Sequence, residues 1–154
     1  MTEMHLAQLN VARPRAAMDD LQMAEFKAAL EPINGLADAA PGFVWRLRDG
    51  FGADATSIRI ADGELMVNLS VWESRDALWN FVYCSPHMDY LRRRREWFHR
   101  MAEPYQVLWW VPAGHYPAVA EAEDRLAAVR SQGPGPDAFT FRQFYPLEGF
   151  TARR

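Results

Sequence analysis

The sequence is poor in the residues and motifs from which several familiar sites are built. Its 154 residues include one cysteine, Cys84, which excludes an intramolecular disulfide and a multi-cysteine metal site. It contains no glycine-rich phosphate loop, no serine nucleophile elbow and no HExxH motif. The usual signatures of an NTPase, a triad hydrolase and a zinc site are therefore missing.

The sequence also lacks a long apolar run and an excess of positive charge. No stretch of about 18 apolar residues occurs, and the N-terminal MTEMHLAQLNVARPR has no apolar segment of signal-peptide length. A net charge of -3 gives no general attraction to phosphate groups. We therefore expect a cytoplasmic protein that binds neither a membrane nor a nucleic acid.

Apolar side chains are plentiful, and their spacing predicts the order of helices and strands. Hydrophobic residues make up 49% of the chain and aromatic residues 13%, as in a packed globular protein. Period-two and period-3.6 patterns, with the turn and cap residues between them, predict strands and helices in the order β-α-β-β-α-β. The strands are expected at 5–11, 43–48, 64–72 and 105–111, and the helices at 19–30, 74–83 and 85–101.

This order predicts an α+β fold of the ferredoxin-like type, an antiparallel sheet with helices on one face. We expect one domain over residues 1–154, with a core at about 5–112 and a C-terminal extension at about 113–154. The extension is expected to contain a helix at 121–130 and a strand at 139–145.

The strand ELMVNLSVW, residues 64–72, indicates how the sheet is covered. Leu65, Val67, Leu69 and Val71 fall on one face, and Met66, Asn68, Ser70 and Trp72 fall on the other. Because neither face is polar enough to face water alone, the face without helices needs a cover. We expect that cover to be the same face of a second subunit, which predicts a homodimer.

The stretch YCSPHMDYLRRRREWFHR, residues 83–100, places polar groups on an apolar helix face. On a helical wheel, His87 and Arg94 fall within the apolar arc and Arg95 lies at its edge. Burying such groups without partners costs several kcal/mol, so each must be hydrogen-bonded, paired or directed into a cavity. The sequence leaves open whether His87 and Arg94 are a satisfied core pair or part of a site.

If they form a site, their chemistry is complementary. His87 lies near the start of its helix, where unpaired N–H groups and the helix dipole disfavour the imidazolium. A neutral imidazole can accept a proton near neutral pH. Arg94, two turns further on, can hold a carboxylate or another oxyanion. The pair would bind and deprotonate an acidic small molecule.

The segment LSVWESRDALWNFVYCSPHMDYL, residues 69–91, resembles the dimeric α/β barrel superfamily, which includes antibiotic-biosynthesis monooxygenases and haem-degrading monooxygenases. With HLAQLNVAR at residues 5–13 and HMDYLRRRREWF at 87–98, the chain resembles more closely an uncharacterised bacterial family of that superfamily. The resemblance covers residues 5 to about 112. It implies a dimeric barrel and leaves the reaction open.

The resemblance implies two kinds of pocket. In haem-degrading members, a strand asparagine, a helix tryptophan and a histidine line the pocket, and Asn10, Trp79 and His87 fall at similar places. The histidine is then the iron ligand. In cofactor-free monooxygenases an aromatic pocket activates a phenol-like substrate, and the residues expected to line it here are Asn10, Trp45, Asn68, Trp72 and Tyr90.

Our first hypothesis is a small-molecule enzyme that needs no cofactor and has its cavity between sheet and helices. It is either a monooxygenase or a proton-transfer isomerase or cyclase of secondary metabolism. The alternatives are a haem protein with His87 as ligand and a non-catalytic ligand-binding or assembly module. The expected catalytic residues are His87 and Arg94, and the expected substrate-binding residues are Asn10, Trp45, Asn68, Trp72, Trp79, Tyr90 and Arg95.

Overall fold

The computed structural model describes residues 3–48, 55–61 and 63–147. Within these segments the strands and helices follow the expected order, with a short extra strand and a 3-10 turn added. The elements are β1 (Met4–Ala12), η1 (Leu21–Met23), α1 (Ala24–Ala39), β2 (Phe43–Arg46), β3 (Arg59–Ile60), β4 (Leu65–Trp72), α2 (Arg75–Cys84), α3 (His87–Arg92), α4 (Arg94–Trp97), β5 (Gln106–Pro112) and α5 (Val119–Gln132).

The strands form one antiparallel sheet in the order β2-β4-β1-β5, with β3 paired to β4. This is the strand order of a ferredoxin-like fold, so the expected fold class is confirmed. β1 lies between β4 and β5, and its Asn10 is in register with Asn68 of β4 and Gln106 of β5. Three amide side chains therefore form one row across the sheet.

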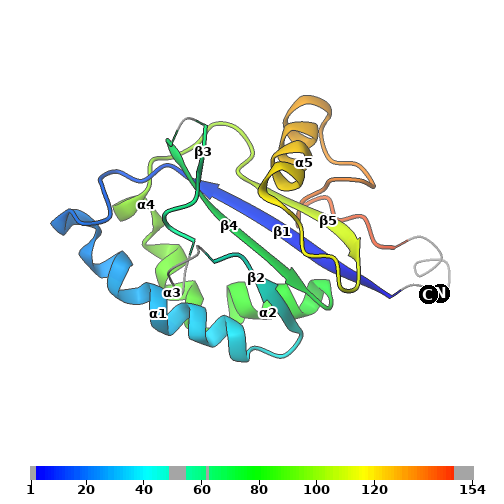
Figure 1. Cartoon of the computed structure of the whole chain (residues 1–154), viewed down its shortest axis with the longest axis horizontal. Coiled ribbons are helices and arrows are strands. Elements are labelled where there is room, and N and C mark those ends of the chain that lie inside the picture. Colours follow the sequence, from blue (N-terminus) through cyan, green and yellow to red (C-terminus); the bar gives the residue numbers. More distant parts are fainter. Residues whose placement is uncertain (1–2, 49–54, 62, 148–154) are drawn as a thin grey trace.

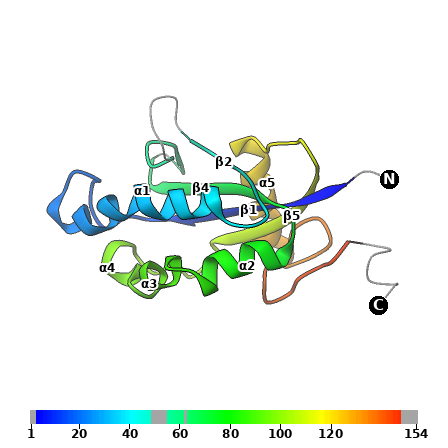
Figure 2. The same ribbon diagram turned by 90° about the horizontal axis from the view of Figure 1, so that it is seen from below.

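The sheet is covered on both faces by elements of the same chain. Helices α1 to α4 lie on one side of it and α5 lies on the other (Figure 1). Figure 2 looks onto the first of these layers, in which α1 runs alongside α2, α3 and α4 with the strands behind. The C-terminal helix thus covers the sheet face for which the sequence predicts a second subunit.

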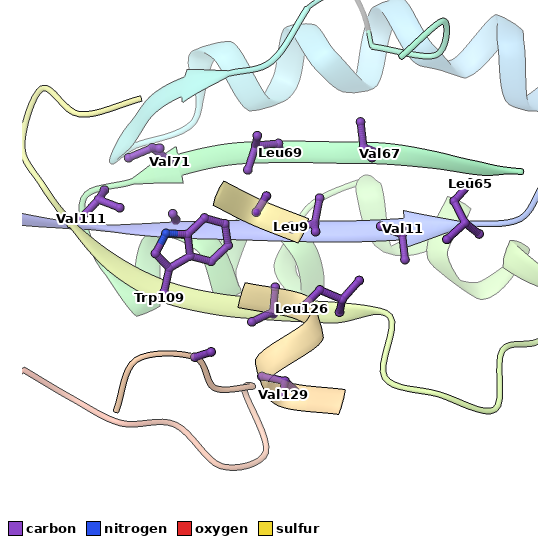
Figure 3. Packing of buried hydrophobic residues seen from close by; sticks show 14 residues of the cluster. Leu9, Val11, Leu65, Val67, Leu69, Val71, Trp109, Val111, Leu126 and Val129 are labelled. Atoms are coloured by element: carbon purple, nitrogen blue, oxygen red, sulfur yellow. The ribbon is translucent and has the colours of Figure 1, made fainter. Parts of the chain in front are cut away.

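The face under α5 is a closed apolar core. Figure 3 shows side chains of β1, β4 and β5 meeting Leu126 and Val129 of α5. Both of these side chains are 3% exposed, and Leu9 and Val11 of β1 are at most 1% exposed. Full burial of one such side chain contributes about 1.5–3 kcal/mol relative to exposure. The packing of α5 is therefore a major source of stability.

Local capping explains where α2 begins and where α3 follows it. Ser74 accepts a hydrogen bond from the Ala77 N–H at 3.1 Å, as an N-cap serine does. Ser85 ends α2 in extended conformation, and its hydroxyl accepts from the His87 N–H at 3.2 Å. These two serines set the position at which the chain presents His87.

The structure differs from the sequence expectations at three places. The helix expected over 85–101 is divided into α3 and α4, because Arg93 leaves helical geometry at φ -93° and ψ 7°. The first helix continues through Pro32 to Ala39. The strand expected at 139–145 is reduced to an isolated bridge between Leu108 and Phe139. Residues 148–154 of the expected extension lie outside the described residues.

No helix in the described segments is long and apolar enough to cross a membrane.

Candidate functional site

A cavity of about 260 Å³ lies between the sheet and the layer of α1 to α4. The sheet supplies its floor, and apolar and aromatic side chains of the helices supply most of its walls. Six of the nine residues expected at a site line it. They are Asn10, Asn68, Trp72, His87, Tyr90 and Arg94.

The floor of the cavity is unusually polar for the middle of a sheet. The amide row of Asn68, Asn10 and Gln106 lies on this face. Asn68 is exposed although β4 is flanked by strands on both sides, because the cavity opens above it. Amides in such a place hydrogen-bond whatever fills the cavity.

The hydrogen bonding of His87 fixes its tautomer. Its Nδ1 lies 3.2 Å from the Val82 carbonyl oxygen, which can only accept, so Nδ1 carries the proton and donates. Within the described segments nothing hydrogen-bonds Nε2, and the ring lines the cavity. Nε2 is therefore the basic nitrogen, and it is the atom available to a ligand.

The protonation state of His87 follows from its surroundings. Burial lowers the pKa of His87 below its ordinary value of 6.5, and the hydrogen bond to Val82 opposes that shift in part. The ring of Phe81 lies 5.1 Å away, centroid to centroid, and adds to the apolar surroundings. His87 is thus neutral near pH 7 and can act as a proton acceptor.

Arg94 is a half-buried cation without an acidic partner among the described residues. Its Nη2 donates to the Val11 carbonyl at 3.3 Å, and its guanidinium carbon lies 4.5 Å from the centre of the Tyr105 ring and 5.5 Å from that of Phe98. Burial lowers the pKa of Arg94, and the Tyr105 phenol acts in the opposite direction. A guanidinium held in this way is suited to an anionic ligand.

The contrast with Arg93 is direct, since the two arginines are neighbours in the chain. Arg93 forms ion pairs with Glu25 of α1 and with Glu96, its Nε lying 2.8 Å from Glu96. No aspartate or glutamate is among the described residues that line the cavity, and its other arginine, Arg46, is bonded to Asp38 at 2.7 Å. The charge that a ligand meets in the cavity is therefore positive.

Sequence reasoning missed several polar residues that the structure brings to the cavity. Gln8 of β1 is 5% exposed and hydrogen-bonds the side chains of Asn68 and Ser70. Its signal in the sequence was its alternation with Ala7 and Leu9, which puts it on the same face as Asn10. Three other missed residues, Tyr83, Tyr105 and Gln106, also line the cavity.

Two of the expected tryptophans lie outside the cavity. Trp45 pairs in register with Val71 and stacks on Tyr116 at 5.3 Å on the α5 side of the sheet. A register shift between Phe43 and Trp45 turns Trp45 to that side. Trp79 packs against Tyr83 at 4.4 Å with Arg75 above its ring, because it lies on the side of α2 that faces the C-terminal segment.

Arg95 is the third expected site residue outside the cavity. It is exposed, and its carbonyl accepts a hydrogen bond from Arg15 at 2.7 Å. Arg95 directly follows Arg94 in α4, and at about 100° per residue its side chain leaves the helix on a different side from that of Arg94.

The cavity does not fit the haem alternative. Its volume of about 260 Å³ lies below the range of about 300–1,000 Å³ that is usual for drug-sized ligands, which are smaller than haem. Trp79, which the resemblance placed in a haem pocket, is outside it. Separately from haem, which needs one axial residue, no group of three or more His, Cys, Asp or Glu side chains suited to a bare metal ion occurs in the described part of the chain.

Comparisons with known proteins place the chain in a family. The family described as "Domain of unknown function (DUF3291)" matches residues 5–154. No curated protein matches the chain.

Several solved structures are similar in fold. Rv0793 from Mycobacterium tuberculosis is 19% identical, with 74% of this chain and 97% of that chain covered and a TM-score of 0.47. SnoaB from Streptomyces nogalater, described as a cofactor-independent oxygenase, is 18% identical, with 72% and 94% covered and a TM-score of 0.42. MupZ from Pseudomonas fluorescens is 13% identical, with 96% and 91% covered and a TM-score of 0.41. Similarities at this level carry no conclusion about activity.

Proposed function

The chain belongs to the DUF3291 family, and we propose that it is an enzyme that removes a proton from a small organic acid or phenol bound in the cavity. His87 is the general base and acts through Nε2. Arg94 holds the negative charge of the ligand, and Asn10 and Asn68 hydrogen-bond its oxygen atoms. Trp72 and Tyr90 supply part of the wall around its apolar body.

One observation carries this proposal. A neutral imidazole with a free basic nitrogen and a cation without an acidic partner among the described residues line the same cavity. A structural pair would be satisfied by neighbouring groups, as Arg93 is by Glu25 and Glu96. His87 and Arg94 instead direct a base and a positive charge into a space large enough for a small ligand.

The proposed first step is common to the reactions that the sequence left open. The substrate C–H or O–H bond breaks, its proton moves to Nε2 of His87, and the electron pair remains on the substrate as an enolate or phenolate near Arg94. Return of the proton from Nε2 to another atom of the substrate would complete an isomerisation. In a cyclisation the carbanion would form a bond to a carbonyl carbon of the same molecule, and the proton on Nε2 would pass to the oxygen that receives the displaced electron pair. In an oxygenation dioxygen would be the oxidant: the carbanion would add to it, the peroxide would take the proton from Nε2, and loss of water from the hydroperoxide would give a carbonyl group.

The test is proton exchange with solvent, because it needs no knowledge of the later steps. A panel of β-keto carboxylates is incubated with the protein in D2O, and NMR follows loss of the acidic C–H signals, while hydroxybenzoates, whose acidic O–H groups exchange without catalysis, are tested for binding. We expect wild-type protein to accelerate exchange for members of the panel, and His87→Ala to abolish the acceleration while folding normally. His99→Ala is the matched control, since His99 is exposed and does not line the cavity.

Two other results would point elsewhere. If His87→Ala lowers the melting temperature and no panel member is exchanged or bound by the wild type, the protein is a non-catalytic module in which His87 is structural. Oxygen uptake, measured with an electrode on any compound that exchanges, distinguishes oxygenation from isomerisation and cyclisation.

We also propose that the protein is a homodimer. The sheet face for which the sequence predicts a second subunit is covered by α5 of the same chain. A dimer would then use another surface or exchange α5 between subunits. Sedimentation equilibrium at micromolar concentration tests it, and a monomeric mass would remove it.

A further inference from the structure

Four side chains under the cavity form a hydrogen-bonded chain whose direction is fixed by its ends. The Trp72 indole Nε1 donates to Ser70 Oγ at 2.8 Å. Nε2 of Gln8 donates to the same oxygen at 2.8 Å and to Asn68 Oδ1 at 2.7 Å. It also lies 3.3 Å from the Asn68 backbone carbonyl oxygen. Gln8, Ser70 and Trp72 are at most 6% exposed.

The chemistry of these groups permits one orientation of the two amides. The Trp72 indole can only donate, so Ser70 Oγ accepts from it. The backbone carbonyl of Asn68 can only accept, so the end of Gln8 that faces it is the NH2 group. Asn68 must then present its own carbonyl oxygen to Gln8. The amide NH2 of Asn68 is left pointing away from Gln8, on the cavity side of an exposed residue.

We propose that Gln8 is a positioning residue that fixes Asn68 as a hydrogen-bond donor, so that the cavity recognises the carbonyl or enolate oxygen of its ligand. The inference rests on the proposed function, which supplies the ligand. It specifies the chemical group of that ligand that the floor of the cavity selects. A ligand with only a donor group at this point would leave the Asn68 N–H groups unpaired. Such mismatches discriminate strongly between ligands, because buried polar groups are costly to leave unsatisfied.

The rest of the floor agrees with this assignment. Asn10 and Gln106 lie in register beside Asn68 and also line the cavity, and the side chains of both lack hydrogen-bond partners among the described residues. Their amides are free to follow the ligand, whereas that of Asn68 is held by Gln8. The selective element of the row is therefore Asn68.

The first test needs no ligand. Side-chain amide resonances of Gln8 and Asn68 are assigned by ¹⁵N NMR, and exchange of their NH2 protons with water is compared. We expect the Gln8 NH2 protons to exchange slowly, because they are buried and donate hydrogen bonds to two side-chain oxygen atoms. We expect those of Asn68 to exchange rapidly. Slow exchange at Asn68 with fast exchange at Gln8 would overturn the assignment, and it would leave the roles proposed for His87 and Arg94 untouched.

The second test reverses the polarity of the floor. Asn68→Asp keeps an oxygen for Gln8 to donate to and replaces the cavity NH2 by a carboxylate oxygen. Acetophenone serves as a neutral carbonyl probe and aniline, which is uncharged near neutral pH, as a donor probe, with binding followed by NMR titration. We expect acetophenone to bind the wild type and to bind Asn68→Asp at least about tenfold more weakly, while aniline shows the opposite preference. Acetophenone that leaves the wild-type Asn68 amide unshifted would overturn the proposal.

The third test addresses Gln8 itself. Gln8→Glu has the same shape but cannot donate when ionised, so Asn68 must turn its NH2 toward the new carboxylate and its oxygen toward the cavity. We expect acetophenone affinity to fall as in Asn68→Asp. The melting temperature of the variant is measured as well, to show that it is folded. Gln132→Glu, an exposed change at the end of α5, is the matched control. A folded Gln8→Glu protein whose acetophenone affinity is unchanged at a pH where the ¹³C shift of the new carboxyl reports its ionised form would show that Gln8 does not position Asn68.

Discussion

On β4, successive side chains alternate between a face that α5 seals and a face that lines the cavity. The sealed face carries Leu65, Val67, Leu69 and Val71, all at most 5% exposed. The cavity face carries Met66, Asn68, Ser70 and Trp72, and on it Asn68 is exposed. The same strand thus contributes to stability through its sealed face and, through Asn68 on the other face, to ligand recognition. Trp72 on the cavity face is 1% exposed and packs in a second apolar core, so Asn68, and not Trp72, can change at little cost to the fold.

The largest effect is expected from a truncation on the sealed face. Leu69→Ala should lower the free energy of unfolding by about 2–5 kcal/mol, because the side chain is 2% exposed and packed in the α5 core. Its neighbour Asn68→Ala should cost only about 1 kcal/mol, for one lost hydrogen bond. Urea denaturation measures both, and equal losses would contradict the division between the two faces.

The next effect concerns the charge in the cavity. Arg94→Met should weaken binding of benzoate by about tenfold to a hundredfold, since a hydrogen bond to a charged group contributes about 1.5–3 kcal/mol. Arg95→Met, one residue along and exposed, should leave benzoate affinity unchanged. Isothermal titration calorimetry on both variants tests this, and parallel losses would show that general surface charge attracts the ligand.

A smaller effect is expected from pH. Because burial lowers the pKa of His87 in the folded state, the unfolded chain binds more protons than the native one below about pH 6.5. The contribution of His87 to stability is therefore constant above that pH and declines as the pH falls below it. Urea titrations of wild type and His87→Gln between about pH 8 and about pH 5 should show a shallower decline in the variant. Parallel curves would indicate that His87 is not desolvated.

The smallest effect is expected at Trp45, which the structure places on the sealed face. Trp45→Phe keeps a ring to stack on Tyr116 and should cost about 0.5–1.5 kcal/mol of stability. Acetophenone and benzoate should bind as they do to the wild type, because Trp45 does not line the cavity. A change in affinity for either probe would show that Trp45 does contribute to the ligand site.

Much of the fold was predictable because periodicity is a local property of the chain. The alternation in β1 and β4 identified both strands and their two faces, and the order of elements predicted the ferredoxin-like sheet. His87 and Arg94 were found because polar residues on an apolar helix face need an explanation. Seven residues apart, they line the same cavity even though the helix is interrupted at Arg93.

The errors arose where a small irregularity of the backbone turns a side chain to another face, or where a single residue carries no pattern. The shift in register between Phe43 and Trp45 moves Trp45 to the α5 side of the sheet. No residue type in that stretch predicts the shift. Gln8 went unnoticed because a single glutamine in a strand is compatible with a solvated face. Only the hydrogen bonds to Asn68 and Ser70 show that it is buried and engaged.

By itself, the sequence determined the order of the main elements, the two-sided character of the sheet and the presence of polar groups that needed partners. These follow from the spacing of apolar residues, which acts over a few positions. The tertiary structure decided that α5 of the same chain covers one face, and that His87, Arg94 and the amide row share one cavity. Such pairings join residues as far apart as Gln8 and Asn68, and they depend on packing and on the match of donors with acceptors, which no local pattern contains.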